Sequence, residues 1–232
     1  MAEMAKSPAR SLYSILNYWR AAGLRGLEVP DPTDLPPDPE ALRMERHSAR
    51  EKMEGEVLSC TACGLHASRR RSVLGEGDLG AELMFITDAA TPEDEESGKP
   101  FSSEAGRLID LILEKLSLNR SSVYLTQCLK CSPPGRHPEK DEIQFCSSFL
   151  RREIEIVSPV AIMTMGSLVT GFLLGLEKPI GLLRGQVHEW LGIPVVPTYH
   201  LNYVLKKRSA RKDVWEDVLL LMKVYNKVKS GK

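Results

Sequence analysis

The feature that most constrains the fold is an alternation of short apolar runs and helix-spaced apolar residues after the first cysteine pair. Runs of five to seven apolar residues bounded by turn signals are typical of buried strands, and apolar residues three and four apart are typical of helices. The expected strands are 81–87, 122–127, 160–166 and 193–199, the last entered through a hairpin, and the expected helices are 104–118, 138–157, 167–174 and 214–228. The alternation predicts an α/β fold with three layers, αβα, around a central, mainly parallel four-stranded sheet.

The first part of the chain has a different character. Residues 10–23 have helical spacing, residues 30–39 carry five prolines that favour an extended linker, and a charged helix is expected over 39–58. We therefore expect an N-terminal appendage over 1–50 and an α/β domain that includes the cysteines over 51–232.

Polar residues stand where the predicted strands end. Asp88 follows the first strand, Gln127 ends the second, Gly166 follows the third and His200 follows the last. In an open parallel sheet, ligands bind outside the carboxyl ends of the strands. The sequence therefore predicts that these four positions line one crevice.

Net charge and hydropathy exclude few classes of function for this chain. The 232 residues contain 31 Lys+Arg and 31 Asp+Glu, so any argument for nucleic-acid binding must rest on local basic patches. No apolar run approaches the roughly 20 residues of a membrane helix, and the N-terminus lacks the apolar core of a signal peptide. We expect a cytoplasmic protein with reduced thiols and no membrane partner.

The cysteines point to a metal centre. Two C-x-x-C pairs, Cys60/Cys63 and Cys128/Cys131, fit a four-cysteine zinc site, and Cys146 is an alternative fourth ligand in place of Cys128. Four thiolates suit an iron–sulfur cluster equally well. Spacing alone leaves zinc and iron–sulfur open.

An ordered set of motifs from Cys60 to Asp217 gives the chain a resemblance to a known family. The motifs are CTACGLHASRRRSVLGEGDLGAELMFI, PEDEESGKPFSSEAGRLIDLIL, SSVYLTQCLKCSPPGRHP, PVAIMTMG, the pair Arg184-Gly185, and IPVVPTYH followed by Trp215-Glu216-Asp217. In this order they resemble the family 4 uracil-DNA glycosylases, the iron–sulfur type. The resemblance implies the uracil-DNA glycosylase fold and a DNA-repair hydrolase that cleaves the N-glycosidic bond of uracil, or another deaminated base, in DNA.

The resemblance also implies a cofactor and a set of ligands. The family holds a structural [4Fe-4S] cluster through four cysteines, which correspond here to Cys60, Cys63, Cys131 and Cys146. Cys128 falls on a position that is not a ligand in the family.

The family's active-site positions are partly changed in this chain. Its GEAPG motif corresponds to TDAAT over 87–91, which places Asp88 on the catalytic acid and Ala89 beside the substrate. Phe101 corresponds to the base-stacking aromatic residue, Gln127 to an asparagine that reads uracil, and His200 to the histidine of an HP motif. The resemblance implies that Asp88 and His200 are catalytic and that Phe101, Gln127 and Ala89 bind the base.

DNA would be the macromolecular partner, single- or double-stranded. Arg184 and the basic run Lys206, Lys207 and Arg208 are the candidates for contacts with phosphates. A replication or repair protein could be recruited through the first 50 residues, and we expect a monomer. The altered 87–91 segment favours, as an alternative, a family member that keeps the fold and cluster and binds DNA without cleaving it.

Overall fold

The computed structural model describes residues 38–231, so the helix expected over 10–23 and most of the proline-rich linker lie outside the described residues. A compact unit that contains the sheet begins at Ala49. The expected division at residue 50 into an appendage and a domain stays a prediction.

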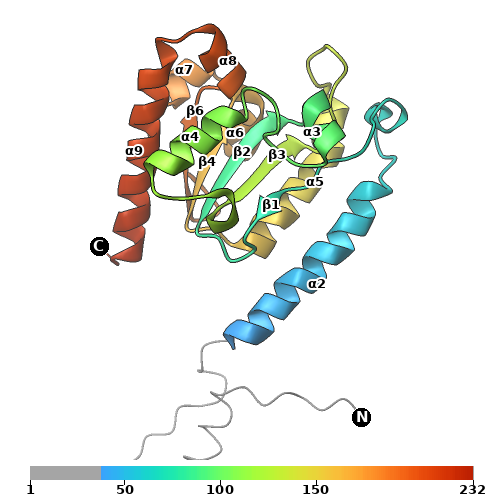
Figure 1. Ribbon diagram of the computed structural model, residues 1–232, viewed down its shortest axis with the longest axis horizontal. Coiled ribbons are helices and arrows are strands. Elements are labelled where there is room, and N and C mark those ends of the chain that lie inside the picture. Colours follow the sequence, from blue (N-terminus) through green and yellow to red (C-terminus); the bar gives the residue numbers. More distant parts are fainter. Residues whose placement is uncertain (1–37, 232) are drawn as a thin grey trace, which may run out of the picture. The chain divides into compact units, whose positions relative to one another are not determined.

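The centre of this unit is a six-stranded sheet in the order β1-β3-β2-β4-β6-β5 (Figure 1). The strands are β1 (Glu76–Gly77), β2 (Leu83–Ala89), β3 (Tyr124–Leu129), β4 (Ala161–Met165), β5 (His188–Trp190) and β6 (Ile193–Thr198). The four inner strands are parallel, as the alternation of strands and helices predicted. The short edge strands β1 and β5 are antiparallel to their neighbours, and only the hairpin that contains β5 was expected.

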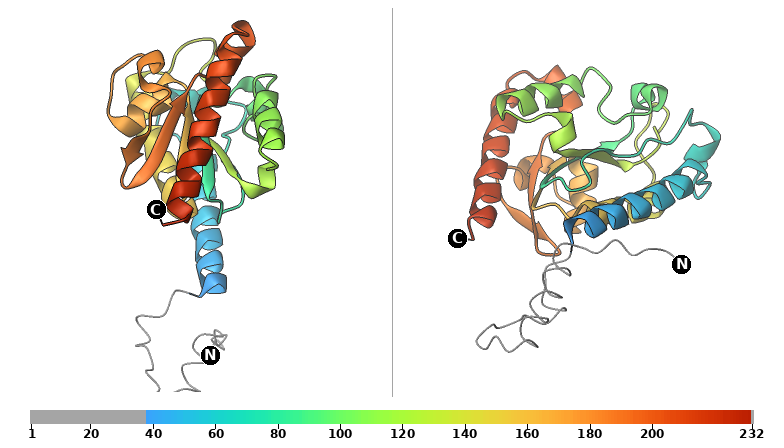
Figure 2. Two further views of the ribbon diagram at one scale, coloured as in Figure 1. Left: turned by 90° about the vertical axis from the view of Figure 1, so that its left-hand side faces the viewer. Right: turned by 60° about the horizontal axis from the view of Figure 1, so that its bottom comes forward.

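Helices cover both faces of the sheet, which gives the three layers (Figures 1 and 2). The α-helices are α2 (Pro39–Leu58), α3 (Pro92–Ser97), α4 (Arg107–Lys115), α5 (Lys140–Val157), α6 (Ser167–Leu174), α7 (Ile180–Leu183), α8 (Leu201–Lys206) and α9 (Ala210–Lys229), and short 3-10 turns stand at η1 (Gly64–Ala67) and η2 (Arg120–Ser122). The predicted αβα architecture is confirmed.

Alternating strand residues supply the two cores between the layers. Phe85 and its neighbours on one face pack against α4, α8 and α9, whereas Met84 and Ile86 pack on the other face against α5 and α6. Because successive strand side chains point to opposite faces, the same alternation decides which end-of-strand residues meet at the site.

The helix boundaries differ most from the sequence expectation in α4 and α9. The helix expected from 104 begins only at Arg107, because residues 101–106 form a tight turn in which Phe101 has a positive φ of 55°. The last helix begins at Ala210 rather than 214. In the part of the chain that the structure describes, no helix combines the length and apolar character needed to cross a membrane.

Candidate functional site

A small hollow opens at the carboxyl ends of the parallel strands. Its wall comes from the end of β2, the start of α3, the turn before α4 and the start of α8. The lining residues are Thr87, Ala89, Thr91, Asp94, Phe101, Ser103, Ala105, Gly106, His200, Leu201 and Asn202. Segments more than a hundred residues apart therefore meet where the topology of the sheet predicts a ligand site.

His200 is fixed in this hollow by both ring nitrogens. Its Nδ1 accepts a hydrogen bond from the backbone N–H of Asn202 at 3.1 Å, which makes His200 the N-cap of α8. Its Nε2 lies 3.2 Å from Thr87 Oγ1. Burial lowers the pKa of His200, so the ring is held neutral. A neutral ring that accepts at Nδ1 carries its proton at Nε2, and His200 is thus a hydrogen-bond donor at the hollow.

Asp88 lies at the same end of the sheet but on the other side of β2. Its Oδ1 accepts the backbone N–H of Val169 at 2.9 Å, so the carboxylate caps the N-terminus of α6. Gly166 allows this approach, because a Cβ there would lie 2.2 Å from Asp88 Oδ2. Burial raises the pKa of Asp88 to about 6. The structure does not bring Asp88 among the residues that line the hollow.

Phe101 and Ala89, by contrast, both line the hollow. Phe101 is only 4% exposed, and it follows Pro100 in the turn between α3 and α4. An aromatic ring at the wall of a hollow can stack on a planar ligand. Ala89, Phe101 and His200 thus share one hollow. The prediction of a crevice lined by Asp88, Gln127, Gly166 and His200 is wrong, because His200 alone of these four lines the hollow.

Gln127 is fully buried on β3, directly beside Thr87 in the sheet register. Its Nε2 donates to the carbonyl of Val73 at 2.7 Å. Among the described residues, its Oε1 has no hydrogen-bond partner. A buried acceptor without a partner is unfavourable unless a ligand or water completes it.

Of the residues predicted to contact phosphates, the three of the basic run are exposed at or just beyond the end of α8, whereas Arg184 is paired inside the protein. Lys206 and Arg208 line a second, polar hollow that shares Asn202 with the first. Lys207 lies on the ring of Tyr203, with Nζ 5.7 Å from its centroid.

Arg184 is engaged inside the protein instead. Its Nε and Nη2 each donate to the Asp217 carboxylate at 2.9 Å, and Nη2 also donates to the carbonyl of Asp213. The structure thus shows Arg184 holding an acid of the same domain, whereas its place in the sequence made it a candidate for a phosphate contact.

Four cysteines meet in a second place. Cys60, Cys63, Cys131 and Cys146 line one hollow at the end of α2, beside η1, the end of β3 and α5. Arg69 Nη1 donates to Cys131 Sγ at 3.6 Å, and the backbone N–H of Lys130 donates to Cys146 Sγ at 3.2 Å. These N–H···S contacts are of the kind that surrounds thiolate ligands of iron–sulfur clusters.

Cys128 does not belong to this group. It is fully buried in the apolar core between the sheet, α5 and α6, and desolvation raises the pKa of its thiol. Within residues 38–231, no three His, Cys, Asp or Glu side chains are gathered tightly enough to hold a metal ion. Because Cys128 does not line the hollow that Cys60, Cys63 and Cys131 share, the arrangement gives no support to the zinc alternative that uses Cys128.

Some residues of the site were not singled out from the sequence. Thr87 is the first residue of the altered 87–91 segment and was given no role, yet it contacts His200, and Asp94 lines the hollow together with Phe101. Strand alternation could have indicated Thr87, since it places residues 85, 87 and 89 on one face. Nothing local marks Asp94, which stands within a run of four acids.

The fold and the site together define an α/β protein that binds its ligand at the carboxyl ends of a parallel sheet, with a cysteine centre beside it. The family model of the uracil DNA glycosylase superfamily matches residues 74–219. The chain belongs to this superfamily.

Relatives with assigned names place it more narrowly. A type-4 uracil-DNA glycosylase of Thermotoga maritima is 35% identical over 178 residues, which cover 75% of this chain and 93% of the relative. The type-4 enzyme of Sulfurisphaera tokodaii is 38% identical over 72% of this chain and 80% of the relative, and that of Saccharolobus solfataricus is 40% identical over 70% and 80%. The resemblance to the type-4 branch is thereby confirmed.

Proposed function

We propose that the chain is a DNA-repair hydrolase that cleaves the N-glycosidic bond of uracil in DNA. The observation that carries the proposal is the hollow in which Phe101, Thr87 and a neutral, donating His200 meet at the carboxyl ends of the parallel strands. Membership of the uracil DNA glycosylase superfamily supports it. The alternative of a member that binds without cleaving gains no support from the relatives, which are named as glycosylases.

The chemistry requires a donor for the departing base. Cleavage leaves positive charge on the sugar and negative charge on uracil, and donors aimed at developing charge are usually the largest catalytic contribution. The Nε2–H of neutral His200, which faces Thr87 Oγ1 in the structure, would donate to a carbonyl oxygen of the leaving base in its place. Phe101 would stack on the base once it has left the duplex.

The hollow must adjust to receive a base. Its volume of about 20 Å³ suffices for a single water molecule. A base therefore enters only when side chains at the wall turn aside, and the ring of Phe101 is the largest of them.

Gln127 lies beside Thr87 and does not line the closed hollow, and it would select the base through its free oxygen once the wall has opened. The carbonyl of Val73 fixes the amide nitrogen on its own side, because an amide oxygen there would face another carbonyl. Oε1 then remains as an acceptor, which matches the N3–H of uracil and meets another acceptor at N3 of cytosine. Rejection of cytosine follows from leaving both acceptors unpaired.

Asp88 would act from beside the hollow rather than inside it. Its carboxylate is held by α6 near the end of β2, where it could stabilise the cationic sugar or orient the attacking water. This role requires the ionised form, and so Asp88 is proposed to act above a pH of about 6.

Cys60, Cys63, Cys131 and Cys146 would hold a [4Fe-4S] cluster. The donor set fits: four thiols from separate segments line one hollow, with N–H donors to two of the sulfurs. A cluster spreads its ligands over four irons, so its thiols need not crowd around one point as they do for zinc. When bound, the cluster would cross-link the end of α2 to β3 and α5 and take no part in the reaction.

Contacts with DNA phosphates are assigned to Lys206 and Arg208, which line the adjoining polar hollow, and to Lys207 between them in the chain. Arg184 is left out of this set because its guanidinium is already paired with Asp217. We further propose a cytoplasmic monomer, with residues 1–50 as an appendage that recruits a replication or repair protein.

A uracil-release assay tests the function. The full chain, purified without oxygen, is incubated with single- and double-stranded oligonucleotides that carry one uracil, one cytosine or one thymine at the same position. We expect abasic product from uracil and none from cytosine. Absence of product from uracil in both strand forms, with an intact cysteine centre, would overturn the proposal.

A further inference from the structure

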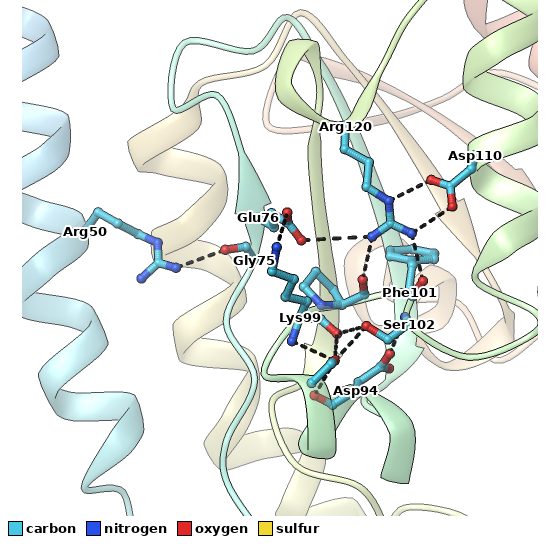
Figure 3. A network of polar contacts seen from close by, with 11 residues as sticks. Arg50, Gly75, Glu76, Asp94, Lys99, Phe101, Ser102, Asp110 and Arg120 are labelled. Atoms are coloured by element: carbon cyan, nitrogen blue, oxygen red, sulfur yellow. Dashed lines mark hydrogen bonds and ion pairs between the residues drawn. The ribbon is translucent and has the colours of Figure 1, made fainter.

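The backbone around Phe101 is held from two sides by side chains of other elements (Figure 3). Phe101 has a φ of 55°, a left-handed conformation that costs energy for any residue with a Cβ. Such a conformation persists only where the surrounding contacts enforce it. The contacts that enforce it therefore decide where the ring of Phe101 lies.

Arg120 holds one side. It stands at the start of η2, just before β3, and its Nη2 donates to the Phe101 carbonyl at 2.8 Å while Nη1 donates to the Pro100 carbonyl at 3.0 Å. Its Nε donates to Asp110 Oδ1 on α4 at 2.6 Å, and Glu76 of β1 lies 3.9 Å away. Figure 3 shows the guanidinium between these partners.

Asp94 holds the other side. This carboxylate is only 2% exposed; its Oδ1 accepts the N–H of Ser102 at 2.6 Å and its Oδ2 accepts the N–H of Thr91 at 2.9 Å. Gly106 allows the turn to close, because a Cβ at this position would lie 2.0 Å from the Phe101 carbonyl oxygen. The carbonyls of Pro100 and Phe101 and the N–H of Ser102 are thus all engaged.

The ion pair with Asp110 does not by itself explain this arrangement. Asp110 is 46% exposed, and pairs between exposed charges contribute little to stability. The pair does orient the planar guanidinium, so that its remaining N–H groups face the two carbonyls. A lysine at this position could not serve the same set of acceptors, since its single nitrogen lacks the planar fork.

We propose that Arg120 is a positioning residue that fixes the backbone of Phe101 so that its ring can stack on the extruded base. The proposal rests on the function proposed above, and it adds a residue that touches neither base nor sugar. Arg120 contacts only the backbone here, so a turn of the Phe101 ring to admit a base would leave these hydrogen bonds in place.

A double-mutant cycle tests the proposal. We expect Arg120→Gln to lower kcat/KM for uracil release by roughly tenfold to a hundredfold, the loss expected for misplacement of about 1 Å. In a Phe101→Leu background the same substitution should change kcat/KM by less than about twofold, because the ring it positions is gone. An undiminished loss in the Phe101→Leu background would overturn the proposal.

Arg152→Gln is the matched control. Arg152 also forms a two-pronged pair with a carboxylate, Glu56, and its exposure of 35% is close to the 27% of Arg120, but it stands on α5 away from the hollow. It should leave kcat/KM unchanged. Equal losses for Arg120→Gln and Arg152→Gln would contradict a specific role for Arg120.

A readout without catalysis separates this proposal from the proposed function. The five phenylalanines are replaced by 4-fluorophenylalanine, and the fluorine resonance of Phe101 is assigned with Phe101→Leu. Arg120→Gln should shift or broaden that resonance and leave those of Phe85 and Phe172 in place. An unchanged Phe101 resonance would contradict the positioning role, whereas a changed resonance in a protein that releases no uracil would refute only the function.

Discussion

At the residue scale, the site depends on which face of β2 each side chain occupies. Thr87 and Ala89 face the hollow and His200, whereas Asp88 between them faces α6. The sequence placed His200 correctly after the last strand, but β2 and β3 run on to Ala89 and Leu129, so Asp88 and Gln127 lie within their strands rather than at or beyond the ends. It could not show that the Asp88 carboxylate accepts a hydrogen bond from the backbone N–H of Val169 on α6, because these residues are 81 positions apart.

The raised pKa of Asp88 predicts opposite effects of pH on activity and stability. Uracil release should fall as the pH drops below about 6, because the proposed role requires the carboxylate. The folded protein binds the proton more tightly than the unfolded chain, so the free energy of unfolding should decrease as the pH rises through this range. Relative to Asp88→Asn, we expect the wild type to lose about 1 kcal/mol between pH 5 and 7.

Urea unfolding at several pH values measures this difference, and a rate profile of uracil release measures the acid limb. Asp88→Asn should lack the limb near pH 6. A constant difference in unfolding free energy between the two proteins from pH 5 to 7 would show that the pKa of Asp88 is not raised.

At the element scale, the order of parallel strands was predictable and the edges were not. The apolar runs of β2, β3 and β4 are strong signals, and the helices between them require parallel connections. β1 contains only two residues, one of them Gly77, and is too short for an alternation of apolar and polar residues to predict a strand. The tight turn over 101–106 was likewise hidden, since residues 104–118 continue a helical apolar pattern.

The cysteine centre provides a prediction about how the elements are joined. Cys146→Ala should abolish the iron and sulfide content of anaerobically purified protein and lower its melting temperature, because metal binding contributes folding free energy. Cys128→Ala should keep full iron and sulfide content and cost only about 1 to 2 kcal/mol of stability, as expected for a small truncation in a core. Iron and sulfide analysis with thermal melts checks both.

Loss of iron from Cys128→Ala, with retention in Cys146→Ala, would reverse the ligand assignment. Tetrahedral zinc in the purified wild type, with no iron or sulfide, would contradict the cluster itself.

At the scale of the whole molecule, a net charge of zero conceals a local basic patch. Lys206 and Arg208 line a hollow next to the one that holds His200, so phosphates would be met beside the extruded base. Composition alone could not predict the basic patch. The position of the basic run shortly after His200 did indicate it. The fold brings the basic run close to His200, because α8 starts at the wall of the hollow and carries Lys206 at its end.

The patch predicts a salt dependence of DNA binding. Lys206→Gln together with Arg208→Gln should reduce the slope of log K against log salt by about 0.7 to 0.9 for each phosphate contact that is lost. Lys227→Gln, in the last turn of α9, should leave the slope unchanged. Binding to an oligonucleotide with an uncleavable abasic analogue measures the slopes, and equal slopes for all three proteins would remove the patch from the DNA contact.

The central claim is that the hollow at the carboxyl ends of the parallel strands is the active site of a uracil-DNA glycosylase. The most direct measurement is the single-turnover rate of uracil release by the wild type and by His200→Asn, with melting temperatures recorded for both. We predict a rate at least about a hundredfold lower for His200→Asn, as for loss of a donor to a developing anion, without a matching loss of stability. A wild-type rate in His200→Asn would contradict the account, because the group that defines the hollow would then play no part in the reaction.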